Sequence, residues 1–479
     1  MPKRLNPLHV YRYLPQTNCG KCGEKSCMAF ASRLIEREVP LELCSPLFEE
    51  KKYASKLKEL QKILRPAVKE VVFGVPPNQI KIGGKDVVYR HEWTWRFQTP
   101  LMIDVHDEMS DEELNDRVKF VNDFAYIRIG KELKLDGIAV RCVSGIAEKF
   151  AKTVAKVMKL TQKPFILCSY DPEILEEALI VSKDRKPLIY AANKKNWKDV
   201  ASLSVKYECP LVVSAPGNLE MLKSLSTSIK EHYNQDEIVL DPGTYTNSSI
   251  IDTISVFTAL RYAAIDAGDL ALGYPLLGVP AVVWLDKEKP PEEKAFTEAV
   301  LACSLMARYA DLLILHSTDV WSILPSIVWR DCVYTDPRVP PSVKPGLYEL
   351  GKPNENSPLL VTGNFALTYY LVKDDVEKAK TDAWLLVIDT EGTSVQSAVA
   401  GKKFTSDKIV ELIEEYNLAE KVKHKSVILP GYAARLSGEL EDMLKDWRVF
   451  VGPRDSAGIK KFLEKIWIPE IFGENKGEE

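Results

Sequence analysis

Leu101-Met102-Ile103-Asp104-Val105 is the first of a series of short apolar segments that recur through the middle of the chain. The series continues with Gly137–Cys142, Pro164–Cys168, Pro187–Ala191, Pro210–Ser214, Glu237–Leu240, Val279–Leu285 and Asp311–Leu315. Nearly continuous runs of Val, Ile and Leu, separated by helical patterns, are typical of parallel strands that are buried on both faces. Eight such strand–helix units predict a TIM barrel, with a doubly wound sheet as the alternative.

The barrel is expected to be one of several domains, because 479 residues exceed what a single core usually holds. We expect residues 1–60 to form a small N-terminal domain and residues 61–335 to contain the barrel, with 61–99 as its connector. Within the connector, Val87–Tyr89 and Trp93–Trp95 are predicted to pair as two strands that close one end of the barrel. Residues 336–358 contain six prolines, which is typical of a linker and predicts a hinge.

Residues 359–479 form the last predicted domain. Its four strand patterns are Leu359–Val361, Trp384–Ile388, Ser426–Leu429 and Arg448–Val451. Four parallel strands with helices between them predict a small Rossmann-like domain, in which ligands bind at the carboxyl ends of the strands. Each strand is followed by a polar or glycine-containing loop, namely Thr362–Asn364, Asp389–Ser394, Pro430–Tyr432 and Gly452–Ser456. Gly392-Thr393-Ser394 would offer donors to a phosphate, although such loops are also ordinary α/β turns.

Composition and charge exclude several classes of protein. The net charge of -4 and the pI of about 6.0 argue against a nucleic-acid-binding protein. The N-terminus lacks the apolar run of a signal peptide, and the apolar stretch Leu270–Leu285 is interrupted by glycine and proline. We therefore expect a cytoplasmic protein that does not enter a membrane.

Four of the nine cysteines lie close to the N-terminus. Cys19, Cys22 and Cys27 form a C-x2-C-x4-C pattern, and Cys44 follows after a further helical segment. Four thiolates are the ligand set of a [4Fe-4S] cubane, and Gly20 and Gly23 are expected to let the loop wrap closely around it. Structural zinc, which usually takes two C-x2-C-like pairs, and free thiols are the alternatives. The other five cysteines occur singly and are expected to be buried core thiols.

The histidines indicate what the last domain lacks. Many cobalamin-binding domains carry a D-x-H-x-x-G motif, whose histidine binds below the cobalt. After residue 358 the chain has one histidine, His424, and it lies outside any such motif. If this domain binds cobalt, no histidine from it is expected to be a ligand.

The cysteine pattern, the eight-stranded middle and the α/β tail without the histidine motif together resemble a known family. The chain is similar to the large (gamma) subunit of the corrinoid iron–sulfur protein, which is part of the acetyl-CoA decarbonylase/synthase complex. The likeness covers essentially the whole chain and includes Pro77–Gly84, Arg90-His91-Glu92 and Val361–Tyr370. In length and sequence the chain resembles methanogenic archaeal members more than acetogenic bacterial ones.

The resemblance implies roles for particular residues. Cys19, Cys22, Cys27 and Cys44 match the cluster ligands. The residues that match contacts to the corrinoid, a cobalamin derivative, are Thr362, Thr368, Gly392, Thr393, Ser394, Val395 and Ala457. The chemistry would occur at cobalt, with no catalytic side chain: Co(I) takes a methyl group from methyl-tetrahydrosarcinapterin or methyl-tetrahydrofolate and passes it to the nickel site of acetyl-CoA synthase. Without an axial ligand Co(II) is easier to reduce, and the cluster returns the electron after accidental oxidation.

The resemblance also implies partners. These are a small (delta) subunit in a heterodimer, acetyl-CoA synthase, a pterin-dependent methyltransferase and an electron donor such as ferredoxin. Two other functions remain open. One is a ferredoxin-like electron carrier or oxidoreductase with a nucleotide-binding tail. The other is a methyltransferase whose barrel binds the pterin itself through Asp104, Asn193 and Asp241, for which we expect negligible pterin binding.

Overall fold

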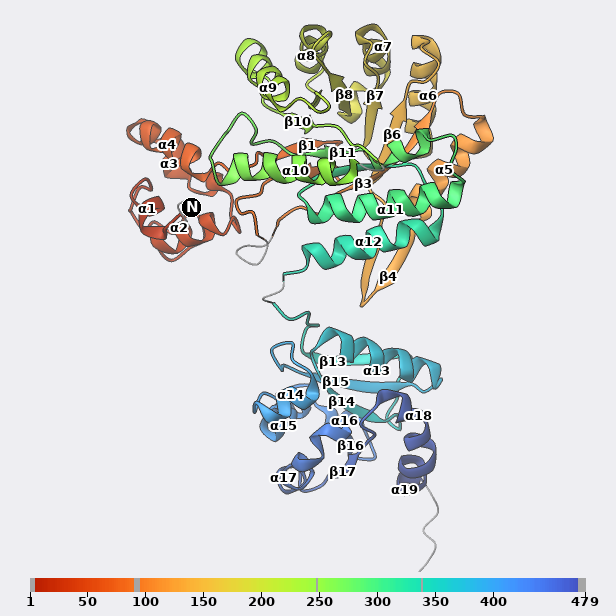
Figure 1. The fold of residues 1–479 in the computed structure, drawn as a ribbon. Coiled ribbons are helices and arrows are strands. Elements are labelled where there is room, and N and C mark those ends of the chain that lie inside the picture. The colour runs from red at the N-terminus through yellow and green to blue at the C-terminus, as the bar shows by residue number, and fades with distance from the viewer. Residues whose placement is uncertain (1–4, 90–94, 247–248, 337–338, 473–479) are drawn as a thin grey trace, which may run out of the picture. The chain divides into compact units, whose positions relative to one another are not determined.

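The computed structural model describes residues 5–89, 95–246, 249–336 and 339–472. The chain divides into two compact units. Unit 1 comprises residues 1–126 and 133–335, and unit 2 comprises residues 127–132 and 336–479. Figure 1 shows the ribbon of both units.

Unit 1 begins with a small helical domain, drawn in red in Figure 1. Its elements are α1 (Pro7–Tyr11), α2 (Cys27–Ile35), α3 (Ser45–Glu49), α4 (Ala54–Leu64) and the 3-10 turns Leu41–Leu43 and Lys51–Tyr53. Phe30, Leu47 and Leu60 are buried in its core together with Cys27 and Cys44. Two of the four cysteines are therefore part of the packing that holds these short helices together.

The rest of unit 1 is built on a sheet of eight parallel strands. They are β3 (Leu101–His106), β6 (Gly137–Arg141), β7 (Phe165–Cys168), β8 (Leu188–Ala192), β9 (Leu211–Ser214), β10 (Ile238–Asp241), β11 (Leu277–Gly278) and β12 (Leu312–Leu315). Their order is β10-β9-β8-β7-β6-β3-β12-β11, so each strand lies beside its neighbour in the chain. A parallel bridge between Leu240 and Leu276 joins the two ends of the sheet. The prediction of a TIM-like barrel is therefore confirmed.

Helices follow the strands and cover the outside of the barrel in Figure 1. They are α5 (Asp111–Asp123), α6 (Ala147–Leu160), α7 (Pro172–Ser182), α8 (Trp197–Lys206), α9 (Leu219–Tyr233), α10 (Ile250–Ile265), α11 (Pro291–Ala307) and α12 (Val320–Tyr334). Local sequence fixes several helix starts. The Ser110 hydroxyl accepts a hydrogen bond from the backbone N–H of Glu113 at 3.1 Å, and Asp171 caps α7 ahead of Pro172.

The predicted strand Val279–Leu285 is wrong. Only Leu277–Gly278 forms the strand there, and Pro280–Leu285 is a 3-10 helix. Pro280 has no N–H to donate to a strand ladder and fixes a backbone angle that suits a helix start, so the apolar run leaves the sheet at this residue.

The connector forms a strand pair, but not at the predicted place. The antiparallel pair is β1 (Val71–Phe73) with β2 (Ile80–Ile82), and Val71, Phe73 and Ile82 belong to the core cluster inside the barrel. The predicted partner Val87–Tyr89 is not a strand, and most of Trp93–Trp95 lies outside the described residues. A second hairpin, β4 (Ala125–Arg128) with β5 (Lys131–Lys134), was not predicted.

Unit 2 contains a five-stranded sheet in the order β13-β15-β14-β16-β17. The four predicted parallel strands are present as β14 (Leu359–Gly363), β15 (Ala383–Ile388), β16 (Ser426–Leu429) and β17 (Arg448–Val451). The fifth, β13 (Gly346–Leu350), pairs antiparallel with β15. Residues 346–350 of the predicted linker 336–358 are therefore an edge strand, a position that tolerates flanking prolines, and the hinge stays a prediction.

Helices cover both faces of this sheet. Buried residues of α14 (Val395–Ala400), α15 (Ser406–Glu415) and α17 (Ser437–Met443) form one core, and those of α13 (Ala366–Lys378) and α18 (Ile459–Phe462) form the other. The remaining helices are α16 (Leu418–Lys421), the π-turn Leu463–Trp467 and α19 (Ile468–Phe472). The strand order reverses between β14 and β16, which is where doubly wound sheets open a crevice for ligands. None of the described helices is long and apolar enough to cross a bilayer.

Candidate cofactor-binding sites

All four N-terminal cysteines line one small cavity in the helical domain. Cys27 and Cys44 are buried, Cys22 is half-buried and Cys19 is exposed. Within the described ranges, no group of three or more His, Cys, Asp or Glu side chains is arranged to hold a metal ion. The cysteines share this cavity, and the Cys19 side of it reaches the surface.

Hydrogen bonds shape the loop that carries the first three cysteines. The backbone N–H of Cys27 donates to Asn18 Oδ1 at 2.9 Å, and the Ser26 hydroxyl accepts from Ala29 N–H at 3.1 Å to cap α2. Gly20 and Gly23 have φ angles of 71° and 86°, which favour glycine, but a Cβ on either would meet nothing within 4 Å. The positive φ angles of the turn therefore favour glycine at both positions, whereas no neighbouring atom of the chain would clash with a side chain there.

The two outermost thiols of the sequence pattern differ in their electrostatics. Hydrogen bonds from the backbone N–H of Lys21 and the hydroxyl of Thr17 lower the pKa of Cys19. Burial raises the pKa of Cys44. Because metal binding requires thiolates, these surroundings favour the binding form of Cys19 and disfavour that of Cys44.

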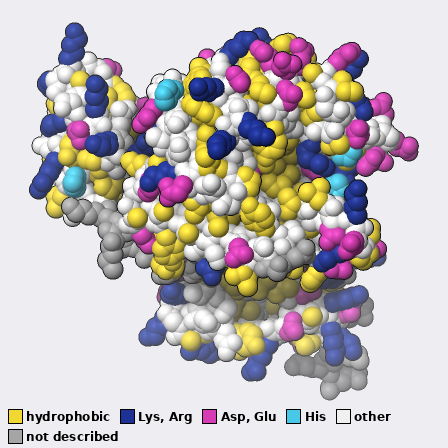
Figure 2. All heavy atoms as spheres, turned by 45° about the horizontal axis from the view of Figure 1, so that its top comes forward, with side chains coloured by type: hydrophobic (Ala, Val, Ile, Leu, Met, Phe, Trp, Pro, Cys, Tyr) yellow, Lys and Arg dark blue, Asp and Glu magenta, His cyan; other side chains and the backbone are white. Residues whose placement is uncertain are grey.

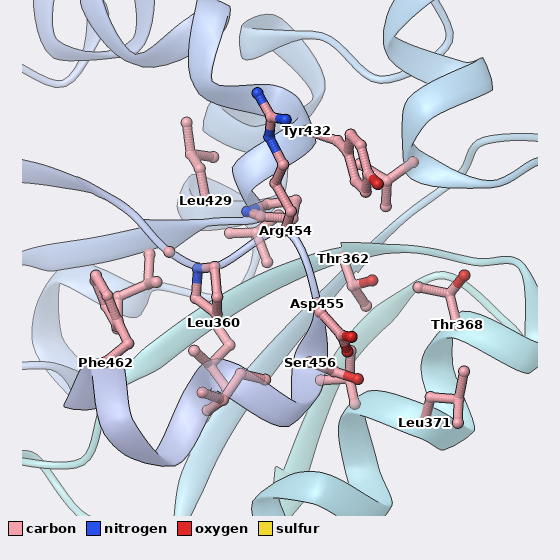
Figure 3. Close-up of a pocket in the computed structure, with 18 of the residues that line it drawn as sticks. Leu360, Thr362, Thr368, Leu371, Leu429, Tyr432, Arg454, Asp455, Ser456 and Phe462 are labelled. Carbon is pink, nitrogen blue, oxygen red and sulfur yellow. The ribbon is translucent and has the colours of Figure 1, made fainter. Parts of the chain in front are cut away.

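A second cavity, of about 340 Å³, lies in unit 2 (Figure 3). It opens at the carboxyl ends of β14, β16 and β17, on the side where the strand order reverses. Its apolar wall is formed by buried Leu360, Ile428, Ile459 and Phe462, and exposed Leu371 also lines it. Its polar groups come from strand ends and helix starts, namely Thr362, Thr368, Ser394, Arg454, Asp455 and Ser456.

Four of the seven predicted corrinoid contacts line this cavity: Thr362, Thr368, Ser394 and Val395. Thr362 is only 2% exposed, and its hydroxyl has no hydrogen-bond partner in the described structure. A buried hydroxyl without a partner is costly, so its position beside the cavity points to a polar atom of a ligand. Ala457 is not a lining residue, although its neighbour Ser456 is.

The loop after β15 does not present the donors that its sequence suggested. The backbone N–H of Gly392 donates to Asn364 Oδ1 at 3.0 Å, and the Thr393 hydroxyl donates to the Thr390 carbonyl at 2.7 Å. Gly392 and Thr393 are not among the cavity-lining residues. In the described structure these groups hold the shape of the loop, as in an ordinary α/β turn, and the role of Gly392 and Thr393 as corrinoid contacts stays a prediction.

His424 lies away from the cavity. One of its ring nitrogens is 3.0 Å from the Ser357 carbonyl and the other is 2.6 Å from the Ser426 hydroxyl. Burial lowers the pKa of this imidazole. The described lining residues of the cavity include no histidine, and the absence of a histidine ligand to cobalt stays a prediction.

The polar residues at the strand ends of the barrel have partners within the protein. Buried Asp104 is bound by Arg117, Arg141 and His316 at 3.2, 2.6 and 2.6 Å. Burial would raise the pKa of Asp104, but the hydrogen bond and charge of His316 and the two arginines lower it. Asp241 accepts hydrogen bonds from the Tyr190 and Ser214 hydroxyls, and Asn193 Oδ1 accepts from the backbone N–H of Lys195.

Models of two known families match this chain, one near its N-terminus and one over most of the rest. Residues 14–46 match the family described as "Putative Fe-S cluster", and residues 70–463 match the family described as "CO dehydrogenase/acetyl-CoA synthase delta subunit". The chain is 45% identical to acetyl-CoA decarbonylase/synthase complex subunit gamma 2 of Methanosarcina thermophila, over 97% of this chain and 99% of the relative. The gamma subunit of Methanocaldococcus jannaschii is 40% identical, over 98% of this chain and 97% of the relative.

This chain belongs to the gamma-subunit family of acetyl-CoA decarbonylase/synthase complexes. The family resemblance stated from the sequence is therefore confirmed.

Solved structures are similar to part of this gamma-family chain. Dihydropteroate synthase from Xanthomonas albilineans matches with a TM-score of 0.38 and 14% identity, over 50% of this chain and 95% of its own length. The enzyme from Thermus thermophilus gives the same TM-score and identity over 54% and 99%.

Sequence reasoning missed several cavity residues of this gamma-family chain. Tyr432, Arg454, Asp455 and Ser456 lie in the loops after β16 and β17. The strand-end rule predicted both loops, Pro430–Tyr432 and Gly452–Ser456, but it did not single out the side chains that line the cavity. The apolar wall was missed altogether, since Leu371 and Phe462 look like ordinary core residues in the sequence.

Proposed function

We propose that this chain carries methyl groups on a bound corrinoid, between a methyl-tetrahydropterin and the nickel site of acetyl-CoA synthase. A corrinoid supplies a cobalt that, when reduced, accepts and releases a methyl group. Membership of the gamma-subunit family and the match to an iron–sulfur family over residues 14–46 support the proposal.

The observation that carries the proposal is the cavity at the switch point of unit 2. Its buried, unpaired Thr362 hydroxyl would bind a polar atom of the corrinoid. Its apolar wall, with Leu360 and Phe462, would take the corrinoid's base once that base has left the cobalt. Thr368 lies in the first turn of α13 and Ser394 caps α14, and both would face the macrocycle.

The lining also supports binding without a protein ligand below cobalt. No histidine is among the described lining residues, and both nitrogens of His424 are engaged elsewhere. An axial donor would stabilise the oxidised metal, so a pocket without one favours the reduced state that methyl transfer needs.

Cys19, Cys22, Cys27 and Cys44 would hold a [4Fe-4S] cluster in the helical domain. The cluster would return an electron when the corrinoid has been oxidised, and would not be consumed at each turnover. The exposed Cys19 edge gives an electron donor such as ferredoxin a point of access. Lys and Arg side chains are spread over this domain, at the left of Figure 2, which suits an acidic donor.

We further propose that a delta subunit is the partner of this chain in a heterodimer. The match of residues 70–463 to a delta-subunit family supports this, since the two subunits would share one architecture. The methyl donor would then be bound by a separate methyltransferase. The barrel residues Asp104 and Asp241 are occupied by protein partners, which fits negligible pterin binding by this chain.

The test is methyl transfer with and without the cluster. The corrinoid-loaded chain is reduced chemically and given methyl-tetrahydropterin with a methyltransferase, and the methylated corrinoid is followed by its visible spectrum. A Cys19→Ser/Cys22→Ser variant should be methylated once like the wild type, but should not recover after oxidation when only ferredoxin is supplied. Recovery at the wild-type rate would contradict the role of the cluster, and no methylation of either protein would contradict the proposed function.

A further inference from the structure

The cavity of unit 2 contains one cation among its described lining residues, Arg454. The guanidinium forms no ion pair or hydrogen bond with a described residue, and its central carbon lies 5.9 Å from the centre of the Tyr432 ring. Figure 3 shows the two side chains beside each other, with Arg454 rising away from the apolar wall near Leu360 and Phe462. Arg454 therefore lies at the rim of the cavity, and its guanidinium N–H donors are available to a ligand.

The neighbouring anion does not neutralise it. Asp455 accepts a hydrogen bond from the backbone N–H of Ala457 at 3.1 Å and so caps the turn that follows. In Figure 3 the side chains of Arg454 and Asp455 point in opposite directions. The rim thus offers a positive charge on one side of the loop.

The backbone holds Arg454 in this place. The N–H of Gly431 donates to the Pro453 carbonyl at 3.0 Å, and the N–H of Gly452 donates to the Leu429 carbonyl at 2.8 Å. A Cβ on Gly431 would lie only 2.7 Å from the backbone nitrogen of Arg454. The loops after β16 and β17 are packed against each other, so the base of this side chain is fixed before any ligand arrives.

We propose that Arg454 binds the phosphodiester that joins the macrocycle of a corrinoid to its base, and so selects complete cobamides over cobinamide. The inference rests on the proposed corrinoid function. A base in the apolar wall and a macrocycle outside the cavity require the connecting phosphodiester to pass the rim. A guanidinium binds phosphate with two parallel hydrogen bonds, and the face of Tyr432 leaves its edge free for them.

The test compares two ligands with the full-length chain. Aquacobalamin carries the phosphodiester and aquacobinamide lacks it, together with the ribose and base. Affinities are measured by equilibrium dialysis for the wild type, Arg454→Met and the control Lys445→Met, which removes an exposed lysine of unit 2 outside the lining. Arg454→Met should bind cobalamin about tenfold more weakly and cobinamide within about twofold of the wild type. Lys445→Met should change neither affinity by more than about twofold.

The wild-type affinity for cobalamin should also fall with salt more steeply than that of Arg454→Met. Equal losses for the two ligands, or no loss for cobalamin, would overturn the role of Arg454 while leaving corrinoid binding intact. If the wild type binds neither ligand, the proposed function itself fails and this inference fails with it.

Discussion

Thr362 allows a specific prediction. A buried hydroxyl that hydrogen-bonds only to a ligand should lower the free energy of unfolding when the ligand is absent. Its side chain is 2% exposed and its hydroxyl has no partner in the described structure. Valine has nearly the same shape without the hydroxyl. Thr362→Val should therefore fold at least as well as the wild type, yet bind a corrinoid less well.

The magnitudes follow from hydrogen-bond energetics. An unpaired buried polar group costs about 1–3 kcal/mol, and water in the cavity would offset part of this for Thr362. We expect the free energy of unfolding of the cofactor-free chain to be unchanged or to rise by up to about 1 kcal/mol. Loss of one hydrogen bond to the ligand, about 0.5–1.5 kcal/mol, should weaken corrinoid binding by roughly 2- to 12-fold.

Thr390 provides a matched control in the same unit. It is fully buried, but its hydroxyl has partners: Asn364 Oδ1 at 2.8 Å and the Thr393 carbonyl at 2.9 Å, either of which can accept its one proton. Thr390→Val should therefore lower the free energy of unfolding by about 1–3 kcal/mol. Urea unfolding of the cofactor-free proteins, followed by tryptophan fluorescence, measures both variants, and equilibrium dialysis with aquacobalamin measures binding.

The reasoning would be refuted if Thr362→Val were destabilised as much as Thr390→Val, since the Thr362 hydroxyl would then have a partner in the folded protein. It would also be refuted if the corrinoid affinity of Thr362→Val equalled that of the wild type. Opposite signs in the two assays are the mark of a binding residue.

Three further predictions concern stability and ligation. Lys85 and Arg261 are buried and bind buried Asp311 at 2.7 and 2.6 Å. Lys85→Met should therefore lower the free energy of unfolding in urea by about 3 kcal/mol. The control Lys152→Met, which removes an exposed ion pair with Glu148, should lower it by less than about 0.5 kcal/mol. Burial would raise the pKa of Asp236, but hydrogen bonds from Lys69, Tyr274 and Lys230 lower it to about 2. The stability that ionised Asp236 contributes is present above pH 4 and is lost as the pH falls towards 2. Asp236→Asn should therefore be about 2 kcal/mol less stable than the wild type at pH 7 and equally stable near pH 2. A constant difference in stability across that range would contradict the lowered pKa of Asp236. His424→Ala should leave the electron paramagnetic resonance spectrum of bound Co(II) corrinoid unchanged, and a loss of nitrogen hyperfine splitting would show that His424 is a ligand after all.

Much of the fold could be predicted because buried parallel strands leave a strong signal. Strands such as Leu101–His106 and Ala383–Ile388 are buried along most of their length, so their apolar runs stand out from the helices between them. The signal failed where burial and backbone preference disagree. Val279–Leu285 is apolar, but Pro280 turns it into a 3-10 helix, and β13 was hidden because prolines surround it.

The candidate sites show a similar division. The four cysteines were found because their spacing is specific, and Thr362 and Thr368 were found through the family resemblance. Leu371 and Phe462 were not found, because they meet only when α13 and α18 pack on the sheet, and Arg454 was part of the predicted loop Gly452–Ser456 but was not singled out. For Gly392 and Thr393 the sequence left donation to a phosphate and an ordinary turn open, because it does not reveal that Asn364 and Thr390 accept their hydrogen bonds.

The most direct test of the account is metal analysis combined with the visible spectrum of the anaerobically purified chain, co-expressed with a delta subunit and supplied with corrinoid. The account predicts about four iron atoms and one cobalt atom for each gamma-family chain, with the spectrum of a corrinoid whose base is off the metal. Iron without any corrinoid absorption under these conditions would contradict it.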